Sequence, residues 1–133
     1  MDLYADQILD HYKHPRHIGT IDNASCEHRE ANLSCGDTVT LRLAIEDGTI
    51  RSVGWNGEGC AISQAGMSLL SEHIMGMGTA AALALTKNDA LALLGVPVSE
   101  RRLKCALLGL HTLQNTLRIH MAMPTRTWAE TVA

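Results

Sequence analysis

The chain has 133 residues, of which 46% are hydrophobic and 19% are charged, and its formal net charge is −3. This length and composition fit a single folded domain over residues 1–133 and exclude a disordered chain. The small acidic excess argues against a nucleic-acid partner, because proteins that bind nucleic acid present a basic patch.

The sequence has no feature of a protein that enters or crosses a membrane. Its longest apolar run, around residues 78–85, is much shorter than the ~20 residues that a membrane-spanning helix needs. The segment 1–16 has acidic residues early and lacks the apolar centre of a signal peptide. We therefore expect a cytoplasmic protein with no membrane partner, and we expect its four cysteines to be reduced thiols.

The N-terminal part of the chain predicts a helix followed by a small antiparallel sheet. Residues 3–12 predict a short helix with Tyr4, Ile8 and Tyr12 along one face. Residues 21–33 are weakly patterned and leave room for a short strand.

A hairpin is the clearest local prediction. Residues 38–46 alternate as a half-buried strand does, and Asp47-Gly48 is a strong hairpin turn. A second strand is expected over residues 49–55, followed by a glycine-rich loop that leads to Cys60. The apolar side chains expected to face the core are those of Val39, Leu41, Leu43 and Ile45.

The rest of the chain predicts helices. Met67, Leu70 and Ile74 share a helical face after Cys60, and the Thr86-Lys87-Asn88-Asp89 sequence is typical of a capping box. Ser99 is expected to cap a long final helix, and the tail from about residue 121 is expected to be flexible. The order predicts an α+β fold: an N-terminal helix, a small three-stranded antiparallel sheet, then a layer of about four helices.

Three of the cysteines lie at the ends of predicted elements. Cys35 precedes a strand, Cys60 lies between the glycine-rich loop and a helix, and Cys105 lies near the start of the last helix. Together with the Asp37 carboxylate they would form a four-ligand site suited to zinc or to an iron–sulfur cluster. There is no CxxC pair, however, so the residues alone leave open that these are unconnected buried cysteines.

Several motifs in the same order resemble those of the NifU-like/IscU/SufU iron–sulfur cluster assembly family. The resemblance runs from Tyr4 to about Leu117. It is carried by Ser34-Cys35-Gly36-Asp37, by Gly57-Glu58-Gly59-Cys60-Ala61-Ile62-Ser63, by Arg102-Leu103-Lys104-Cys105-Ala106, and by the opening segment from Tyr4 to Gly19 with Ile8-Leu9-Asp10-His11-Tyr12 and Pro15-Arg16.

The resemblance implies a fold, a site and partners. The fold would be the SufE/NifU-like IscU fold. Cys35, Cys60 and Cys105 would be the assembly cysteines and candidate persulfide acceptors, and Asp37 would join them as a ligand. The site would hold an iron–sulfur cluster, [2Fe–2S] in type, or Zn²⁺. The partners would be a SufS/IscS-like cysteine desulfurase that delivers sulfur, and apo iron–sulfur proteins or carriers that receive the cluster.

The subfamily stays open between two functions. Lys104 stands where IscU-type members carry histidine, and the Arg-x-Lys-Cys pattern resembles SufU, but the insertion usual in SufU between Cys60 and Cys105 is missing. We therefore expect a cluster assembly scaffold, with a zinc-dependent sulfurtransferase or desulfurase activator as the alternative. Either is a scaffold or sulfur-transfer protein rather than a classical enzyme. A plain structural zinc domain is a third reading.

Other residues receive simpler predictions. Cys26 is expected to be an ordinary structural or exposed thiol, and His11, His14 and His17 a solvated basic segment. By the resemblance, His11 and Arg16 would face the desulfurase. The start of the last helix and the adjacent Lys104 are expected to favour the thiolate form of Cys105.

Overall fold

The computed structural model describes residues 3–133, with side chains described from Ala5 onward. The side chain of Tyr4 therefore lies outside the described part. Within residues 3–133, no helix combines the length and apolar character that a membrane crossing requires. In chain order the elements are α1 (Leu3–Lys13), β1 (Cys26–Asn32), β2 (Asp37–Glu46), β3 (Thr49–Glu58), α2 (Ala61–Ile74), α3 (Thr79–Leu83), α4 (Lys87–Leu94), the 3-10 helix η1 (Glu100–Arg102), α5 (Leu103–His120) and α6 (Trp128–Val132).

The predicted α+β fold is confirmed. The three strands form one antiparallel sheet in the order β1-β2-β3, and β1 is the strand that the weak pattern of residues 21–33 left open. The β2–β3 hairpin turns at Asp47 and Gly48, whose φ angles of 52° and 70° are both positive. Positive φ at both central residues defines the turn type that matches the twist of a tight hairpin, and the Asp-Gly sequence favours it.

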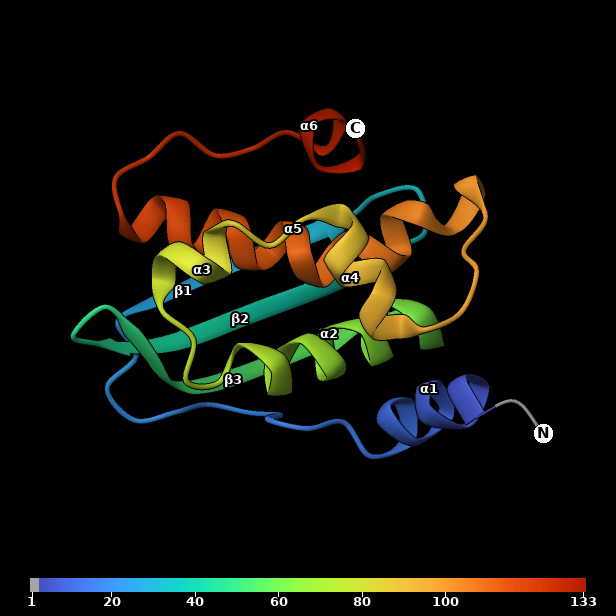
Figure 1. The fold of residues 1–133 in the computed structure, drawn as a ribbon, viewed down its shortest axis with the longest axis horizontal. Coiled ribbons are helices and arrows are strands. Elements are labelled where there is room, and N and C mark those ends of the chain that lie inside the picture. Colours follow the sequence, from blue (N-terminus) through green and yellow to red (C-terminus); the bar gives the residue numbers. More distant parts are fainter. Residues whose placement is uncertain (1–2) are drawn as a thin grey trace.

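Helices cover one face of the sheet. Helix α5 lies on β1 and β2, α2 lies beside α5 and against β3, and α1 packs along α2 (Figure 1). The alternation of β2 turns Val39, Leu41 and Leu43 into this layer, where none has any exposed surface. Burying each such side chain contributes about 1.5–3 kcal/mol, so the alternating pattern fixes which face of the sheet meets the helices.

One local expectation is confirmed and two need correction. Strand β3 continues to Glu58, so Gly57 and Glu58 belong to the sheet and not to a loop. The capping box of α4 is present, with the Thr86 side chain accepting from the backbone N–H of Asp89. Ser99 caps no long helix: it precedes η1 and makes no side-chain cap bond, and α5 begins only at Leu103.

The tail that is expected to be flexible contains a short helix, which packs on α5. A capping box of Thr127 and Glu130 starts α6. The Trp128 ring stacks on the His111 ring with 4.0 Å between centroids, and its Nε1 donates to the backbone oxygen of Ala31 at 3.2 Å. His111 lies on α5, where it is buried and bonded through Nδ1 to Thr131 Oγ1 at 2.7 Å.

The histidine segment also differs from its prediction. His11 is buried, with Nδ1 2.7 Å from the Ser68 hydroxyl and Nε2 3.5 Å from Glu72, so it fastens α1 to α2. Its burial lowers its pKa. His14 and His17 are exposed as expected. The predicted helix is confirmed as α1, but its packed face differs from the prediction: Tyr12 is 45% exposed, whereas the polar His11 is buried.

Candidate metal centre

The sheet topology brings the predicted ligands to one edge of the molecule. In an antiparallel sheet of order β1-β2-β3, the end of β1, the start of β2 and the end of β3 meet at the same edge. Cys35 lies in the turn between β1 and β2, and Asp37 is the first residue of β2. Cys60 is the residue before α2, and Cys105 lies in the first turn of α5. Residues far apart in the chain therefore converge because both helices begin at this edge.

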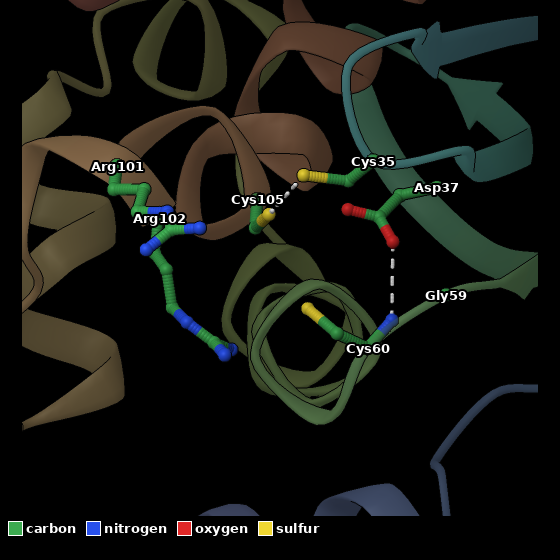
Figure 2. Close-up of a pocket in the computed structure, with 7 residues that line it drawn as sticks. All are labelled: Cys35, Asp37, Gly59, Cys60, Arg101, Arg102 and Cys105. Atoms are coloured by element: carbon green, nitrogen blue, oxygen red, sulfur yellow. Dashed lines mark hydrogen bonds between the residues drawn. The ribbon is translucent and has the colours of Figure 1, made fainter.

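A cavity of about 460 Å³ lies at this edge (Figure 2). The three cysteines of the sequence motifs, the aspartate, a glycine and two arginines line it. These residues are Cys35, Asp37, Gly59, Cys60, Arg101, Arg102 and Cys105.

Three of the four predicted ligands form a tight group. One ligand atom from each of Cys35, Asp37 and Cys105 lies within 4.8 Å of the other two, and the two sulfur atoms are 3.5 Å apart. Separations of this size are close to those between ligand atoms around one tetrahedral ion with bonds of about 2.0–2.3 Å. Cys60 is not part of this group. It lines the same cavity, and its sulfur points into the cavity (Figure 2).

Asp37 provides the clearest sign that the cavity suits a cation. The residue is 1% exposed, and its Oδ1 accepts a hydrogen bond from the backbone N–H of Cys60 at 3.1 Å. Its Oδ2 is buried and has no partner among the described residues. A buried polar atom without a partner is costly, and a metal ion beside the thiols would satisfy this oxygen. The donor set therefore fits zinc or a thiolate-bound cluster.

Gly59 makes room for this carboxylate. Its φ is +151°, and a Cβ atom added there would lie 2.3 Å from Asp37 Oδ1 and 2.8 Å from Ser63 Oγ. Only glycine avoids this overlap, so the second glycine of the Gly57-Glu58-Gly59-Cys60 sequence is required by the close approach of Asp37.

The expectation that Cys105 favours its thiolate form is wrong for the metal-free protein. The residue is 3% exposed, and burial is the largest cause that raises the pKa of its thiol, followed by the neighbouring Asp37 carboxylate and Cys35 thiol. Lys104 is exposed and does not line the cavity, so it does not offset these effects. A bound cation would have to supply the stabilisation that the thiolate lacks.

Two arginines at the cavity are a feature that the sequence reasoning missed. Arg101 and Arg102 belong to η1 and line the cavity on the side away from Asp37 (Figure 2). The available signal was their position just before Cys105 in the sequence. Their fixed positive charges favour anionic sulfur in the cavity.

The fourth cysteine lies apart from the centre. Cys26 opens β1, packs against the main core and is not part of the cavity lining. Burial raises the pKa of its thiol to about 11, so it is a structural thiol, as expected.

A small α+β protein that gathers thiols and a buried carboxylate at one sheet edge has the donor set of a site for a metal ion or a metal–sulfur cluster. The chain belongs to the family of the NifU-like N terminal domain, which its sequence matches over residues 3–126.

Sequence similarity to named proteins supports this family membership. The chain is 30% identical over 129 residues to the zinc-dependent sulfurtransferase SufU of Bacillus subtilis, covering 84% of this chain and 87% of that protein. It is 40% identical over 74 residues to the iron-sulfur cluster assembly scaffold protein IscU of Thermotoga maritima, covering 56% of this chain and 52% of that protein.

Solved structures share the fold. The structure of FiSufU, a protein of the SUF system from Fervidobacterium islandicum, aligns with a TM-score of 0.72 at 31% identity over 84% of this chain and 94% of that one. The N-terminal part of a NifU-like protein from Brucella abortus aligns with a TM-score of 0.74, over 92% of this chain and 96% of that one; at 18% identity it supports the fold alone.

Proposed function

We propose that this protein assembles iron–sulfur clusters: it accepts sulfur from a cysteine desulfurase and holds iron or a nascent cluster in the cavity at the sheet edge. The observation that carries this proposal is the buried, unpartnered Oδ2 of Asp37 beside two sulfur atoms that are 3.5 Å apart. Cys35, Asp37, Cys60 and Cys105 are the proposed ligands. The resemblance to scaffold proteins of the family supports the same assignment.

Sulfur transfer would use a thiolate of this site as the nucleophile. The thiolate attacks the outer sulfur of the desulfurase persulfide, a new S–S bond forms here, and the desulfurase cysteine leaves as a thiolate. Cys35 is exposed whereas Cys105 is buried, so an incoming persulfide reaches Cys35 more easily. Arg101 and Arg102 would stabilise the added negative charge on the persulfide.

A second candidate function is a zinc-dependent relay of sulfur that builds no cluster. The ligand atoms of Cys35, Asp37 and Cys105 lie close enough together to surround a single ion, which favours this function. The similarity to the SufU protein points the same way. When bound, zinc would hold the thiols deprotonated and keep them ordered.

Purification without oxygen, followed by metal analysis and reconstitution, separates the two functions. A scaffold should develop the visible absorption of an iron–sulfur cluster when supplied with iron and sulfide, and the cluster should pass to an apo-ferredoxin. A zinc relay should retain zinc, form no cluster and still accelerate a cysteine desulfurase. If the protein did neither, the proposed function would be wrong.

Matched thiol variants locate the chemistry. Cys60→Ser should reduce cluster formation or sulfur transfer, because Cys60 lines the cavity. Cys26→Ser should leave both unchanged, because Cys26 lies at the start of β1, packs against the main core and does not line the cavity. Equal loss in both variants would contradict the proposed ligand set.

Asp37→Ala should slow cluster release, because the carboxylate is a weaker ligand for a soft metal than a thiolate and its departure opens a position. Unchanged cluster lifetime and transfer rate would refute that role. We propose apo iron–sulfur proteins or carriers as recipients, and a cytoplasmic setting in which the thiols stay reduced.

A further inference from the structure

We propose that Asn32 is a positioning residue of the metal centre, which holds the buried sulfur of Cys105 and lowers its electron density by donating a side-chain N–H to it. This inference rests on the proposed function, because it concerns the same cavity. It adds a residue outside the predicted ligand set and assigns a physical effect to it.

The hydrogen bonds of Asn32 connect two parts of the centre. Its side-chain Nδ2 donates to Cys105 Sγ at 3.7 Å, within the range for a sulfur acceptor. Its backbone oxygen accepts from the N–H groups of Cys35 and Gly36 at 3.2 and 2.9 Å. One residue therefore fixes both the turn that carries Cys35 and the sulfur of Cys105, and the sulfur atoms of these two cysteines lie 3.5 Å apart.

Burial and a second hydrogen bond of the same side chain fix the geometry of this bond. Asn32 is 2% exposed, is the last residue of β1 and is paired with Asp37 in the sheet register. Its side-chain Oδ1 accepts from the backbone N–H of Ser34 at 3.3 Å, which leaves the amide nitrogen pointing to the sulfur. The preceding residue, Ala31, is held by the Trp128 indole, so the strand end cannot move freely.

The bond has a chemical consequence once a cation replaces the thiol protons. A donor N–H withdraws electron density from a thiolate, and hydrogen bonds to sulfur are among the features that set the reduction potential of thiolate-bound clusters. Groups that orient metal ligands from outside typically change metal affinity by 10–100-fold when removed. Asn32 is the one hydrogen-bond donor from the described residues that reaches this sulfur.

A purely structural asparagine would behave differently. If Asn32 only closed the turn through Ser34 and the backbone, its removal would cost stability without altering the bound metal. Asn115 offers the matched control, since it is also buried and its side chain connects α5 to β1. It donates to Glu30 at 3.0 Å and to the Arg126 backbone at 3.1 Å, and none of its bonds reaches a sulfur.

The experiment uses Co²⁺ as the probe, because sulfur-to-cobalt charge transfer reports directly on the thiolate ligands. Asn32→Ser keeps a side-chain oxygen but is too short to reach Cys105. Asn32→Leu keeps a similar volume and loses the N–H donor without adding a charge that could itself bind the metal. Both should shift the charge-transfer band to lower energy and weaken Co²⁺ binding by about 10–100-fold. Asn115→Ser should lower the melting temperature and leave the band in place.

The outcomes separate this inference from the proposed function. A band at the wild-type position in a folded, cobalt-bound Asn32 variant would overturn the inference, as would an equal shift in Asn115→Ser. If the wild-type protein itself bound Co²⁺ without a thiolate charge-transfer band, the proposed metal centre would be wrong and the inference with it. A shift confined to the Asn32 variants would support both.

Discussion

Replacing Gly59 by alanine should displace the Asp37 carboxylate from the metal centre. The new Cβ would lie 2.3 Å from Asp37 Oδ1 and 2.8 Å from its Cγ, well inside contact distance. Asp37 cannot yield without breaking its 3.1 Å bond from the backbone N–H of Cys60, since it is buried at the start of β2. Gly59→Ala should therefore act on the metal site as Asp37→Ala does.

Gly59→Ala should lower both the folding stability and the metal affinity. A non-glycine residue at positive φ costs about 1–2 kcal/mol, and the overlap with Asp37 and Ser63 adds to that. A total loss of about 2–3 kcal/mol would lower the melting temperature of a chain of this size by roughly 6–12 °C. Losing the carboxylate should also weaken Zn²⁺ or Co²⁺ binding by at least about tenfold, which corresponds to about 1.4 kcal/mol.

Gly48→Ala separates the strain from the overlap. Gly48 has a φ of +70° in the β2–β3 turn, and an added Cβ would meet nothing within 4 Å. This variant should lose about 1–2 kcal/mol of stability and keep its metal affinity. The assays are thermal unfolding of the metal-free proteins and metal titration in competition with a chromophoric chelator.

A double variant provides the sharpest test. In the Asp37→Ala background the carboxylate is already gone, so Gly59→Ala should weaken metal binding little further, since the two changes act on one interaction. Metal affinity of Gly59→Ala equal to that of the wild type would refute this reasoning. So would a metal-binding penalty that persists in full when Asp37 is absent.

Three further predictions concern stability. Trp128→Ala should destabilise the protein by about 2–4 kcal/mol in urea unfolding, because it removes the ring stacked on His111, whereas the exposed Met123→Ala in the same segment should change it little; equal effects would contradict docking of α6. Burial lowers the pKa of His111 from 6.5 despite the nearby Glu30, so the unfolded chain takes up its proton first and the free energy of unfolding should fall as pH drops below about 6.5. His111→Gln should flatten that fall and the exposed His120→Gln should not; an unchanged profile in His111→Gln would refute the assignment. Finally, Zn²⁺ at 100 times its Kd should stabilise the protein by about 2.7 kcal/mol, measured as the melting temperature with and without chelator, and a melting temperature insensitive to the metal would contradict the site.

Local patterns predicted much of the fold because they depend on neighbours in the chain. The alternation of residues 38–46 and the Asp-Gly turn identify the hairpin without further information, and the Thr86–Asp89 capping box marks the start of α4. The same local signals failed where packing decides. The polar tail gave no sign that Trp128 would find a partner in His111, a residue on another helix.

The ligand residues of the candidate site could be predicted from the sequence, but their convergence in space could not. The residue types and their positions at element ends, together with the family resemblance, pointed to Cys35, Asp37, Cys60 and Cys105. Their convergence could not be read from spacing, because it depends on the strand order and on where α2 and α5 begin. The position of Arg101 and Arg102 at the cavity could not be predicted for the same reason.

Short segments were enough to predict the strand and helix periods, the tight turn and the chemistry of the four candidate ligands, since each of these is a local property. The burial of Asp37 with one oxygen unpartnered, the raised pKa of Cys105 and the contact of Asn32 with its sulfur became visible only in the folded chain. Those properties come from burial and from contacts between distant segments, which act only after the chain has folded.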